Sequence, residues 1–178
     1  NVVFPGAGYV VAAMALHQND LSDGGSFGLE NIKFQQMLVL ADSEVQNLFL
    51  TLNPISNQFD IQSKTVTDDS SWSQRATGKC IVGNFSNTPP KLDLQSIEST
   101  LDQIVSSDSI YEKFDNVKLK YGPYFRGIDS LKSNKRELVA KIKGCEGIQK
   151  SEQDYFIHPG LLDSCFQTLI AFDTEDYG

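Results

Sequence analysis

The stretch His158-Pro-Gly-Leu-Leu-Asp-Ser-Cys-Phe-Gln167 decides how this chain is interpreted. Pro159 stands where a helix accepts a proline, because the first helical residue needs no amide hydrogen. Asp163 and Gln167 are four residues apart and therefore share one face of that helix. Apolar residues recur around them at three- and four-residue spacing, which predicts a helix; they are Leu161, Leu162, Cys165, Phe166, Leu169, Ile170 and Phe172.

An Asp on a mostly apolar helix needs a physical explanation. An unpaired carboxylate is costly to bury, and protonation relieves that cost. Keeping Asp163 neutral near pH ~7 against a reference pKa of about 3.9 requires roughly 4 kcal/mol, which desolvation in an apolar cleft can supply. A neutral Asp163 is a proton donor for a departing hydroxyl. The alternative is an Asp163 that faces solvent and bonds to Gln167, and the pattern alone leaves both open.

Three further segments carry a resemblance. Tyr121-Gly-Pro-Tyr-Phe-Arg-Gly127 resembles the YGPxFxG signature, and residues 158–167 resemble the HPxxLDxxxQ signature, of the dehydratase domain of polyketide synthases and animal-type fatty acid synthases. The opening Phe4-Pro-Gly-Ala-Gly-Tyr9 resembles the PGAGY helix start of that family. Trp72-Ser-Gln-Arg-Ala-Thr-Gly78 resembles a fourth stretch that usually lies between the others. The resemblance therefore spans nearly the whole chain.

The resemblance implies an α+β double hot-dog fold, in which two curled antiparallel sheets each wrap a central helix, here incomplete at both ends. A first helix over residues 5–18 is apolar almost all round, as a helix enclosed by a sheet is. The length of 178 residues with 40% hydrophobic content suits one domain. We expect a single domain 1–178, with a first half 1–86, a linker 87–96 and a truncated second half 97–178.

Strands are expected between the two helices. Alternating apolar residues predict strands over 32–40, 48–52 and 138–142, with a slip at Gln36-Met37 that a bulge would explain. Two short helices are expected over 97–105 and 110–114, separated by the polar break 106–109. Around Trp72 the inward positions carry side chains small enough to let a strand approach a central helix: Gln74, Ala76, Gly78, Cys80 and Val82.

Composition excludes some classes of function. A net charge of −8 disfavours nucleic acid, whose affinity depends on neutralised phosphates. The longest apolar run, residues 9–16, is far shorter than the ~20 residues that span a bilayer, and no basic residue precedes Lys33 as in a signal peptide. A cytoplasmic location with no membrane contact is expected. The three cysteines form no CxxC pair and are expected to be reduced, packed thiols: Cys80, Cys145 and Cys165.

The resemblance implies loss of water from a 3-hydroxyacyl thioester, leaving a 2,3-enoyl thioester. The substrate is carried on the phosphopantetheine of acyl carrier protein, and no cofactor binds the domain itself. The family pattern assigns Asp163 as the acid, Gln167 as the group that orients its carboxyl, and the Tyr121 phenol as a contact of the hydroxyl or carboxyl. The alternative interpretation is that Tyr121 is a core aromatic residue whose hydroxyl lies at the rim of the core.

Two further segments are candidates for substrate binding. Backbone N–H groups of Gly6, Ala7 and Gly8, next to Tyr9, lie where a helix amino end favours negative charge developing on the thioester carbonyl. In the second segment the candidates are Pro123 and Phe125. Both Pro-Gly and Gly-Pro pairs are also simply turn formers.

The catalytic base is where the sequence departs from the family. The expected HxxxGxxxxP motif ends at a proline that corresponds to Pro5, which puts its glycine just before Asn1 and its histidine four positions further upstream. His17 is interpreted as a surface residue and His158 as a residue that caps or packs at its turn. The chain is therefore interpreted as an internal fragment lacking the histidine segment, inactive by itself.

Expected partners are the carrier protein and other domains of the same synthase, with a homodimer through the parent synthase. The negative charge disfavours long-range attraction to an acidic carrier, but a tethered carrier has a high effective concentration. Lys132, Lys135 and Arg136 form either a solvated strand end or a carrier contact. Two other functions stay open: a product-template cyclase, which uses a similar His and Asp pair for aldol closure, and a non-catalytic structural module.

Overall fold

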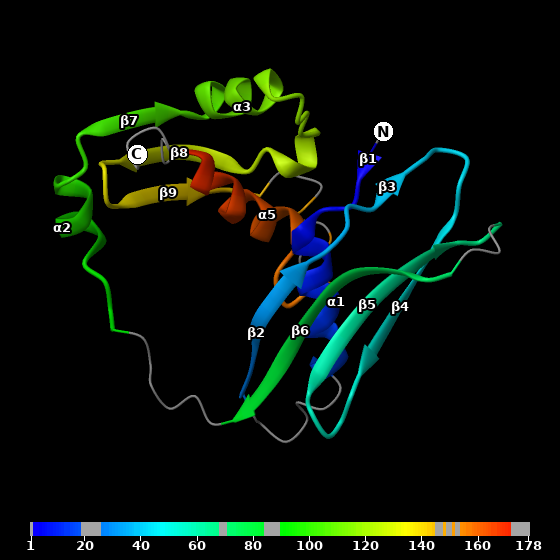
Figure 1. The fold of residues 1–178 in the computed structure, drawn as a ribbon. Helices are drawn as coiled ribbons and strands as arrows, with labels where there is room; N and C mark the ends of the chain where they lie inside the picture. Colours follow the sequence, from blue (N-terminus) through cyan, green and yellow to red (C-terminus); the bar gives the residue numbers. More distant parts are fainter. Residues whose placement is uncertain are drawn as a thin grey trace. The chain divides into compact units, whose positions relative to one another are not determined.

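The computed structural model describes residues 2–18, 26–67, 71–83, 90–144, 148, 151 and 154–171, except the side chains of residues 17, 18, 26, 82, 170 and 171. The chain forms two compact units, Asn1–Thr88 and Pro89–Gly178, and Figure 1 colours them along the sequence. No helix among the described residues combines the length and the apolar character needed to cross a membrane.

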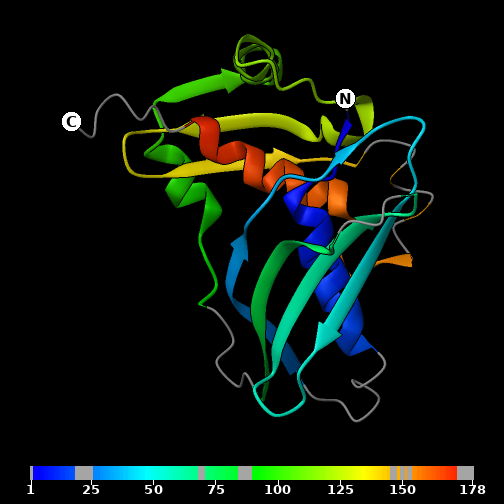
Figure 2. The same ribbon diagram turned by 45° about the vertical axis from the view of Figure 1, so that its right-hand side comes forward.

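The first unit is a curved antiparallel sheet with one helix against it (Figures 1 and 2). The strand order of its four-stranded sheet is β2-β6-β5-β4, and β1 pairs with β3 in a separate two-stranded sheet. The element bounds are β1 Val2–Val3, α1 Gly6–Gln18, β2 Ser26–Phe34, β3 Val39–Leu40, β4 Gln46–Leu52, β5 Gln58–Thr65 and β6 Ser73–Gly83.

The core of the first unit lies between α1 and the sheet. Tyr9 and Ala13 of α1 pack in one cluster with Phe59 and Ile61 of β5 and with Ala76 of β6. Ala13 and Ala76 are both fully buried, so small side chains do let the strand approach the helix, as expected. Gly78 of β6 leaves room for the ring of Phe59 on the neighbouring strand β5, because a Cβ at residue 78 would lie 2.4 Å from Cζ of Phe59. The helix over residues 5–18 and the strand over 48–52 are confirmed.

The predicted slip at Gln36-Met37 is wrong. The irregularity lies inside β2, where the register against β6 shifts between Glu30 and Lys33. Asn31 has a φ of 55° there, a left-handed conformation that asparagine tolerates better than most residues. The chain then leaves the sheet after Phe34, and the next two extended residues pair with β1 instead.

The second unit is a three-stranded antiparallel sheet, in the order β7-β8-β9, flanked by helices. Ile110, Tyr111 and Phe114 of α3 form its core with Ile128 and Leu131 of β8. Figure 1 shows α3 beside β7 and α5 beside β9. The element bounds are α2 Leu94–Ser99, β7 Gln103–Ser106, α3 Ser107–Asn116, η2 Pro123–Phe125, β8 Ile128–Ser133, β9 Leu138–Ile142, α5 Pro159–Gln167 and η4 Thr168–Ala171.

The helix predicted over 97–105 is too long, whereas the other helix predictions in this unit hold. Ile104 and Val105 belong to strand β7, which pairs with β8. The polar break does start the next helix, because the hydroxyl of Ser106 accepts a hydrogen bond from the amide of Ser109 at 3.2 Å and caps α3. The predicted strand at 138–142 is β9.

Candidate active site

Helix α5 is held at its first turn by His158 and Gly160. The Nδ1 atom of His158 accepts a hydrogen bond from the amide of Gly160 at 3.0 Å, which caps the helix and confirms the expected capping role. Pro159 occupies the first helical position. Gly160 lies against η2, since a Cβ at this position would come 2.8 Å from the carbonyl oxygen of Tyr124. The start of α5 is therefore fixed against the segment that carries Tyr121.

The buried face of α5 is polar, which corrects the expectation from the apolar spacing. Asp163, Ser164 and Gln167 are buried, with Asp163 only 9% exposed. Phe166 and Leu169, whose apolar spacing helped to predict the helix, are 42% and 64% exposed. The side chains of residues 170 and 172, and the side chain of His17, lie outside the described residues.

Gln167 connects the acid to the loop before β8. Its Nε2 donates to Oδ2 of Asp163 at 2.7 Å and to the carbonyl oxygen of Phe125 at 3.0 Å. A carbonyl oxygen only accepts hydrogen bonds, so the Phe125 contact fixes which way the amide points. Both N–H groups of Gln167 are thereby used. Among the described residues, its buried Oε1 has no hydrogen-bond partner.

Asp163 is buried in a way that favours its neutral form. Desolvation raises the pKa of this carboxyl above its ordinary value, and the hydrogen bond from Gln167 lowers it in part. Desolvation is the larger effect, since removal from water disfavours the charged form. Only Oδ2 receives a hydrogen bond from a described residue, so Oδ1 is the oxygen left to carry and donate a proton.

Tyr121 is half-buried and lies within the electrostatic field of Asp163. Its ring packs edge-on against Phe114, with centroids 4.8 Å apart, and also meets Tyr111 at 6.4 Å. Burial raises the pKa of the Tyr121 phenol, and the charges of Asp163 and Tyr111 raise it further. The phenol is therefore a neutral hydrogen-bond donor at neutral pH, and the ring is also part of the local core.

Ser164 and Tyr111 support the site and were missed in the sequence. The hydroxyl of Ser164 donates to the carbonyl of Gly160 at 2.8 Å and accepts from the amide of Gly127 at 3.2 Å. The Tyr111 hydroxyl accepts from the amide of Ile128 at 3.2 Å. The contacts of Ser164 with Gly127 and of Tyr111 with Ile128 join positions 37 and 17 residues apart, so no local sequence pattern predicts them.

The loop candidates differ in exposure. Pro123 is the exposed first residue of η2, whereas Phe125, at its end, is half-buried and contributes its carbonyl to Gln167. The Arg126 guanidinium lies over the ring of Tyr111, 4.6 Å from its centroid.

The remaining candidates, Gly6, Ala7, Gly8 and Tyr9, belong to the first unit. The amide of Gly8 donates to the carbonyl of Pro5 at 2.9 Å, a bond that a thioester carbonyl would have to replace. A Cβ at Gly8 would lie 2.6 Å from the ring of Phe4, so this position requires glycine. The buried hydroxyl of Tyr9 has no hydrogen-bond partner among the described residues, and burial raises its pKa.

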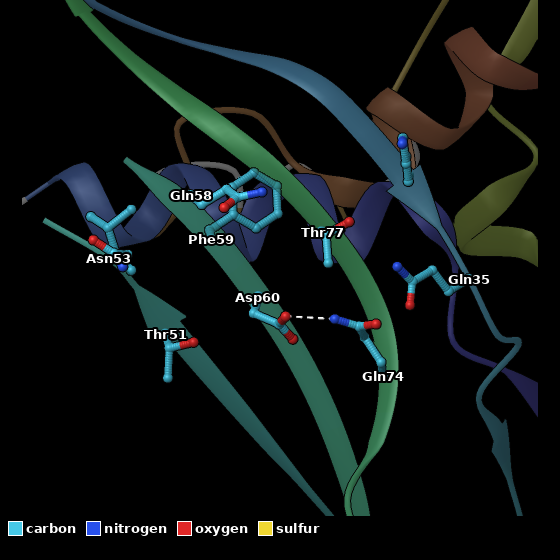
Figure 3. A pocket seen from close by; sticks show the side chains of 10 residues that line it. Gln35, Thr51, Asn53, Gln58, Phe59, Asp60, Gln74 and Thr77 are labelled. Carbon is cyan, nitrogen blue, oxygen red and sulfur yellow. Dashed lines mark hydrogen bonds between the residues drawn. The ribbon is translucent and has the colours of Figure 1, made fainter. Parts of the chain in front are cut away.

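A hollow lies elsewhere in the first unit. It has a volume of about 610 Å³ and is lined by residues of four strands and their turns. Figure 3 shows Asp60 and Gln74 pointing toward each other there, with Gln74 Nε2 donating to Asp60 Oδ2 at 2.6 Å. None of the candidate catalytic residues lines it.

Metal and cysteine chemistry find no support among the described residues. No three His, Cys, Asp or Glu side chains gather there as a metal site requires. Cys80 is a buried free thiol and Cys165 an exposed one, while Cys145 lies outside the described part of the chain.

Comparison with known proteins decides the family. Residues 89–177, which carry the site around Asp163, match the family described as the polyketide synthase dehydratase N-terminal domain. The chain belongs to the polyketide synthase dehydratase family. It is 30% identical to the highly reducing polyketide synthase FUM1 of Gibberella moniliformis, over 94% of this chain and 7% of that protein. It is 29% identical to polyketide synthase PksM of Bacillus subtilis, over 75% of this chain and 3% of that protein.

Solved dehydratase structures share the fold. The dehydratase domain from the CurK module of the curacin polyketide synthase is 25% identical, with a TM-score of 0.81 over 94% of this chain and 59% of that one. An inactive mutant of the CurJ dehydratase is 29% identical, with a TM-score of 0.83 over 96% and 58%. The α+β hot-dog fold expected from the resemblance is thus confirmed. The chain spans less than two thirds of these structures and a small part of the synthases.

Proposed function

We propose that this dehydratase-family chain supplies the acid half of a site that removes water from a 3-hydroxyacyl thioester, giving a 2,3-enoyl thioester. One observation carries the proposal. Asp163 is buried, its Oδ2 is held by Gln167 at 2.7 Å, and its Oδ1 receives no hydrogen bond from a described residue. Desolvation raises the pKa of this carboxyl and so favours its protonated form, which can donate the proton when a hydroxyl leaves.

The proposed step is the loss of water across carbons two and three of the thioester. Asp163 gives its proton to the oxygen on carbon three, the bond between carbon three and that oxygen breaks, and water departs. A base takes the proton from carbon two, and the electrons of that C–H bond form the new double bond. Asp163 is left as a carboxylate, which the N–H of Gln167 stabilises. It regains a proton before the next turnover.

For the base we look to the histidine of the HxxxGxxxxP motif, which the resemblance puts ahead of Asn1. His158 is a poor alternative because its Nδ1 accepts the cap of α5. The relatives support a mechanism with two groups: a CurK dehydratase with a His-to-Phe substitution and one with an Asp-to-Asn substitution are both described as inactive.

Tyr121 is proposed to donate a hydrogen bond to the substrate hydroxyl. Support comes from its raised pKa, which is caused mainly by burial and keeps the phenol protonated, and from the further rise caused by ionised Asp163, which indicates that the two groups lie near each other. The substrate is proposed to arrive on the phosphopantetheine of an acyl carrier protein, with no cofactor bound by the domain. Other domains of a cytoplasmic synthase, and a second copy of it, are the remaining proposed partners.

The test uses the complete dehydratase domain and a 3-hydroxybutyryl thioester, followed by mass spectrometry. We expect loss of one water and an enoyl product. A domain that leaves this substrate intact but closes a ring in a poly-keto thioester would be a cyclase and would overturn the proposal. A domain inactive on both would favour a structural module. Tyr121→Phe should lower kcat and leave the fold unchanged, as judged by circular dichroism.

A further inference from the structure

The loop that leads into Tyr121 carries exposed cations. From residue 113 to residue 126 the sequence contains four basic residues and one carboxylate, Asp115, in a chain of net charge −8. Lys118 and Lys120 are exposed, and no described residue forms an ion pair with either of them. Elsewhere in the unit, Lys132 and Lys143 each hold a carboxylate at 2.8 Å.

Apolar side chains are exposed beside these cations. Val117, Leu119 and Tyr124 are 60%, 48% and 57% exposed. A patch of exposed apolar groups bordered by charges has the composition of a protein interface, with contact area at its centre and charge at its rim. We call residues 117–126 the lysine loop.

The lysine loop is fixed at both ends. At its start, the amide of Leu119 donates to the carbonyl of Phe114 at 2.9 Å and that of Lys118 to Asp115 at 2.9 Å, which ties the loop to the end of α3. At its end, the carbonyl of Phe125 holds Gln167. A partner that binds this loop is therefore directly connected to the group that orients Asp163.

We propose that the lysine loop docks the phosphopantetheine-bearing face of the carrier protein, an inference that rests on the proposed function. The phosphodiester of that arm is an anion, and Lys118 and Lys120 are exposed cations of the same loop as Tyr121 that form no ion pair with a described residue. Arg126, also in this loop, lies over the ring of Tyr111. The exposed apolar residues contact the carrier around it. Electrostatic steering of this kind acts mainly on encounter and weakens with salt.

The strand-end group of Lys132, Lys135 and Arg136 fits this role less well. Lys132 is neutralised by Glu98 at 2.8 Å, and Lys135 has a partner of its own. Arg136 lies in the turn between β8 and β9, where its backbone amide donates to Asn134 at 2.7 Å. The structure thus favours the lysine loop over the basic group that stands out in the sequence.

The experiment compares two forms of one substrate with the complete domain. A 3-hydroxybutyryl group is presented on the carrier protein or as an N-acetylcysteamine thioester, which has no phosphate. For Lys118→Glu combined with Lys120→Glu we expect KM for the carrier form to rise about tenfold, with a smaller rise at high salt. Turnover of the small thioester should stay within about twofold, because neither lysine contacts Asp163 or Gln167 among the described residues.

Two charge reversals serve as controls. Lys91→Glu makes the same change at an exposed residue of the same unit, and Arg136→Glu makes it at the rival group; both should leave KM for the carrier form unchanged. An unchanged KM in the double variant would overturn the proposal, as would an equal rise in Arg136→Glu. An equal loss of activity on both substrates would also overturn the proposal, because the lysines would then affect catalysis by Asp163 and not the binding of the carrier protein.

A measurement of carrier-protein binding tests the docking surface independently of the proposed reaction. If the unmodified domain turns over neither substrate, the proposed reaction is wrong, and docking is read from fluorescence anisotropy of a labelled carrier that bears phosphopantetheine. Binding that weakens about tenfold in the double variant supports the docking surface. Binding that is unchanged, or absent in the unmodified domain, contradicts it.

Discussion

The hydroxyl of Ser164 accepts a hydrogen bond from the amide of Gly127 at 3.2 Å and fills the space that a side chain at Gly127 would need. The last residue of the YGPxFxG stretch is thereby fastened to the residue that follows Asp163. Two of the segments that carry the family resemblance, residues 121–127 and 158–167, are therefore in direct contact next to the acid.

Gly127→Ala should destabilise the protein by roughly 1–3 kcal/mol, as overpacking of a buried position does. The new Cβ would meet Oγ of Ser164 at 2.6 Å. Unfolding in urea measures the change. Gly122→Ala is the matched control in the same segment, since nothing lies within 4 Å of a Cβ there and φ is −71°. Equal effects of the two substitutions would contradict the close contact.

Gln167→Ala should lower both stability and kcat while changing KM little. The half-buried carbonyl of Phe125 loses its donor at 3.0 Å and keeps only the Tyr111 hydroxyl at 3.5 Å, a loss of about 1 kcal/mol. Asp163 loses its orientation, and its pKa rises further because the hydrogen bond from Gln167 lowers it. Gln167→Glu should be worse at neutral pH, because a carboxylate would face both the Phe125 carbonyl and Asp163. Steady-state kinetics with urea unfolding checks both variants, and a Gln167→Glu enzyme as active as the unmodified one would contradict this role.

Asp163→Asn should make the fold more stable at neutral pH. Burial raises the folded-state pKa of Asp163 above its ordinary value of 3.8, so the folded state binds the proton more tightly than the unfolded state does. Ionisation therefore destabilises the folded state as pH rises from that ordinary value through the folded-state pKa. The asparagine variant avoids this loss. Its advantage in unfolding free energy should disappear below about pH 3, where Asp163 is protonated in both states.

Comparing the stability of Asp163→Asn with that of the unmodified protein also detects an Asp163 whose pKa is lowered by folding. A carboxyl stabilised as its anion would make the variant less stable at neutral pH, with the difference again vanishing in acid. Thermal unfolding of both proteins from acidic to neutral pH distinguishes these two signs.

Gly78→Ala tests the core of the first unit. Its Cβ would lie 2.4 Å from the Phe59 ring, so we expect a loss of about 1–3 kcal/mol. Combining it with Phe59→Leu should recover part of that loss, because the smaller side chain removes the clash, and a double-mutant cycle measures the coupling. Gly83→Ala on the same strand has open space around it and should be nearly neutral. Strict additivity of the Gly78 and Phe59 substitutions would contradict the contact.

Helices that begin with a local sequence signal were predicted correctly. The Pro-Gly pair at the start of α5 and the serines at the start of α3 act within a few residues, so their helices follow from the sequence alone. The two-residue period of a strand correctly predicts Ala76 and Cys80 of β6 as inward residues, and both are fully buried. Gln74 was wrongly predicted to point inward, because the register against β5 shifts between Ile61 and Gln62 and Gln74 bonds to Asp60 instead.

The errors arise where distant contacts decide the structure. Ile104 and Val105 fit a helical period, but pairing with β8 makes them a strand. The apolar spacing of α5 predicted a helix but did not show which face is buried, and the face that meets the rest of its unit is the one with Ser164 and Gln167. The partners of those polar residues, Gly127 and Phe125, lie about forty residues away, and no propensity encodes such a contact.

Loss of water catalysed by the complete domain, with and without Asp163→Asn, tests the central claim most directly. A carrier-bound 3-hydroxybutyryl thioester is incubated with each protein, and mass spectrometry follows the enoyl product while circular dichroism checks the fold. We predict that the variant is folded and forms no enoyl product above the uncatalysed background. Product formation at the unmodified rate would contradict the account, because the proton would then come from a group other than Asp163.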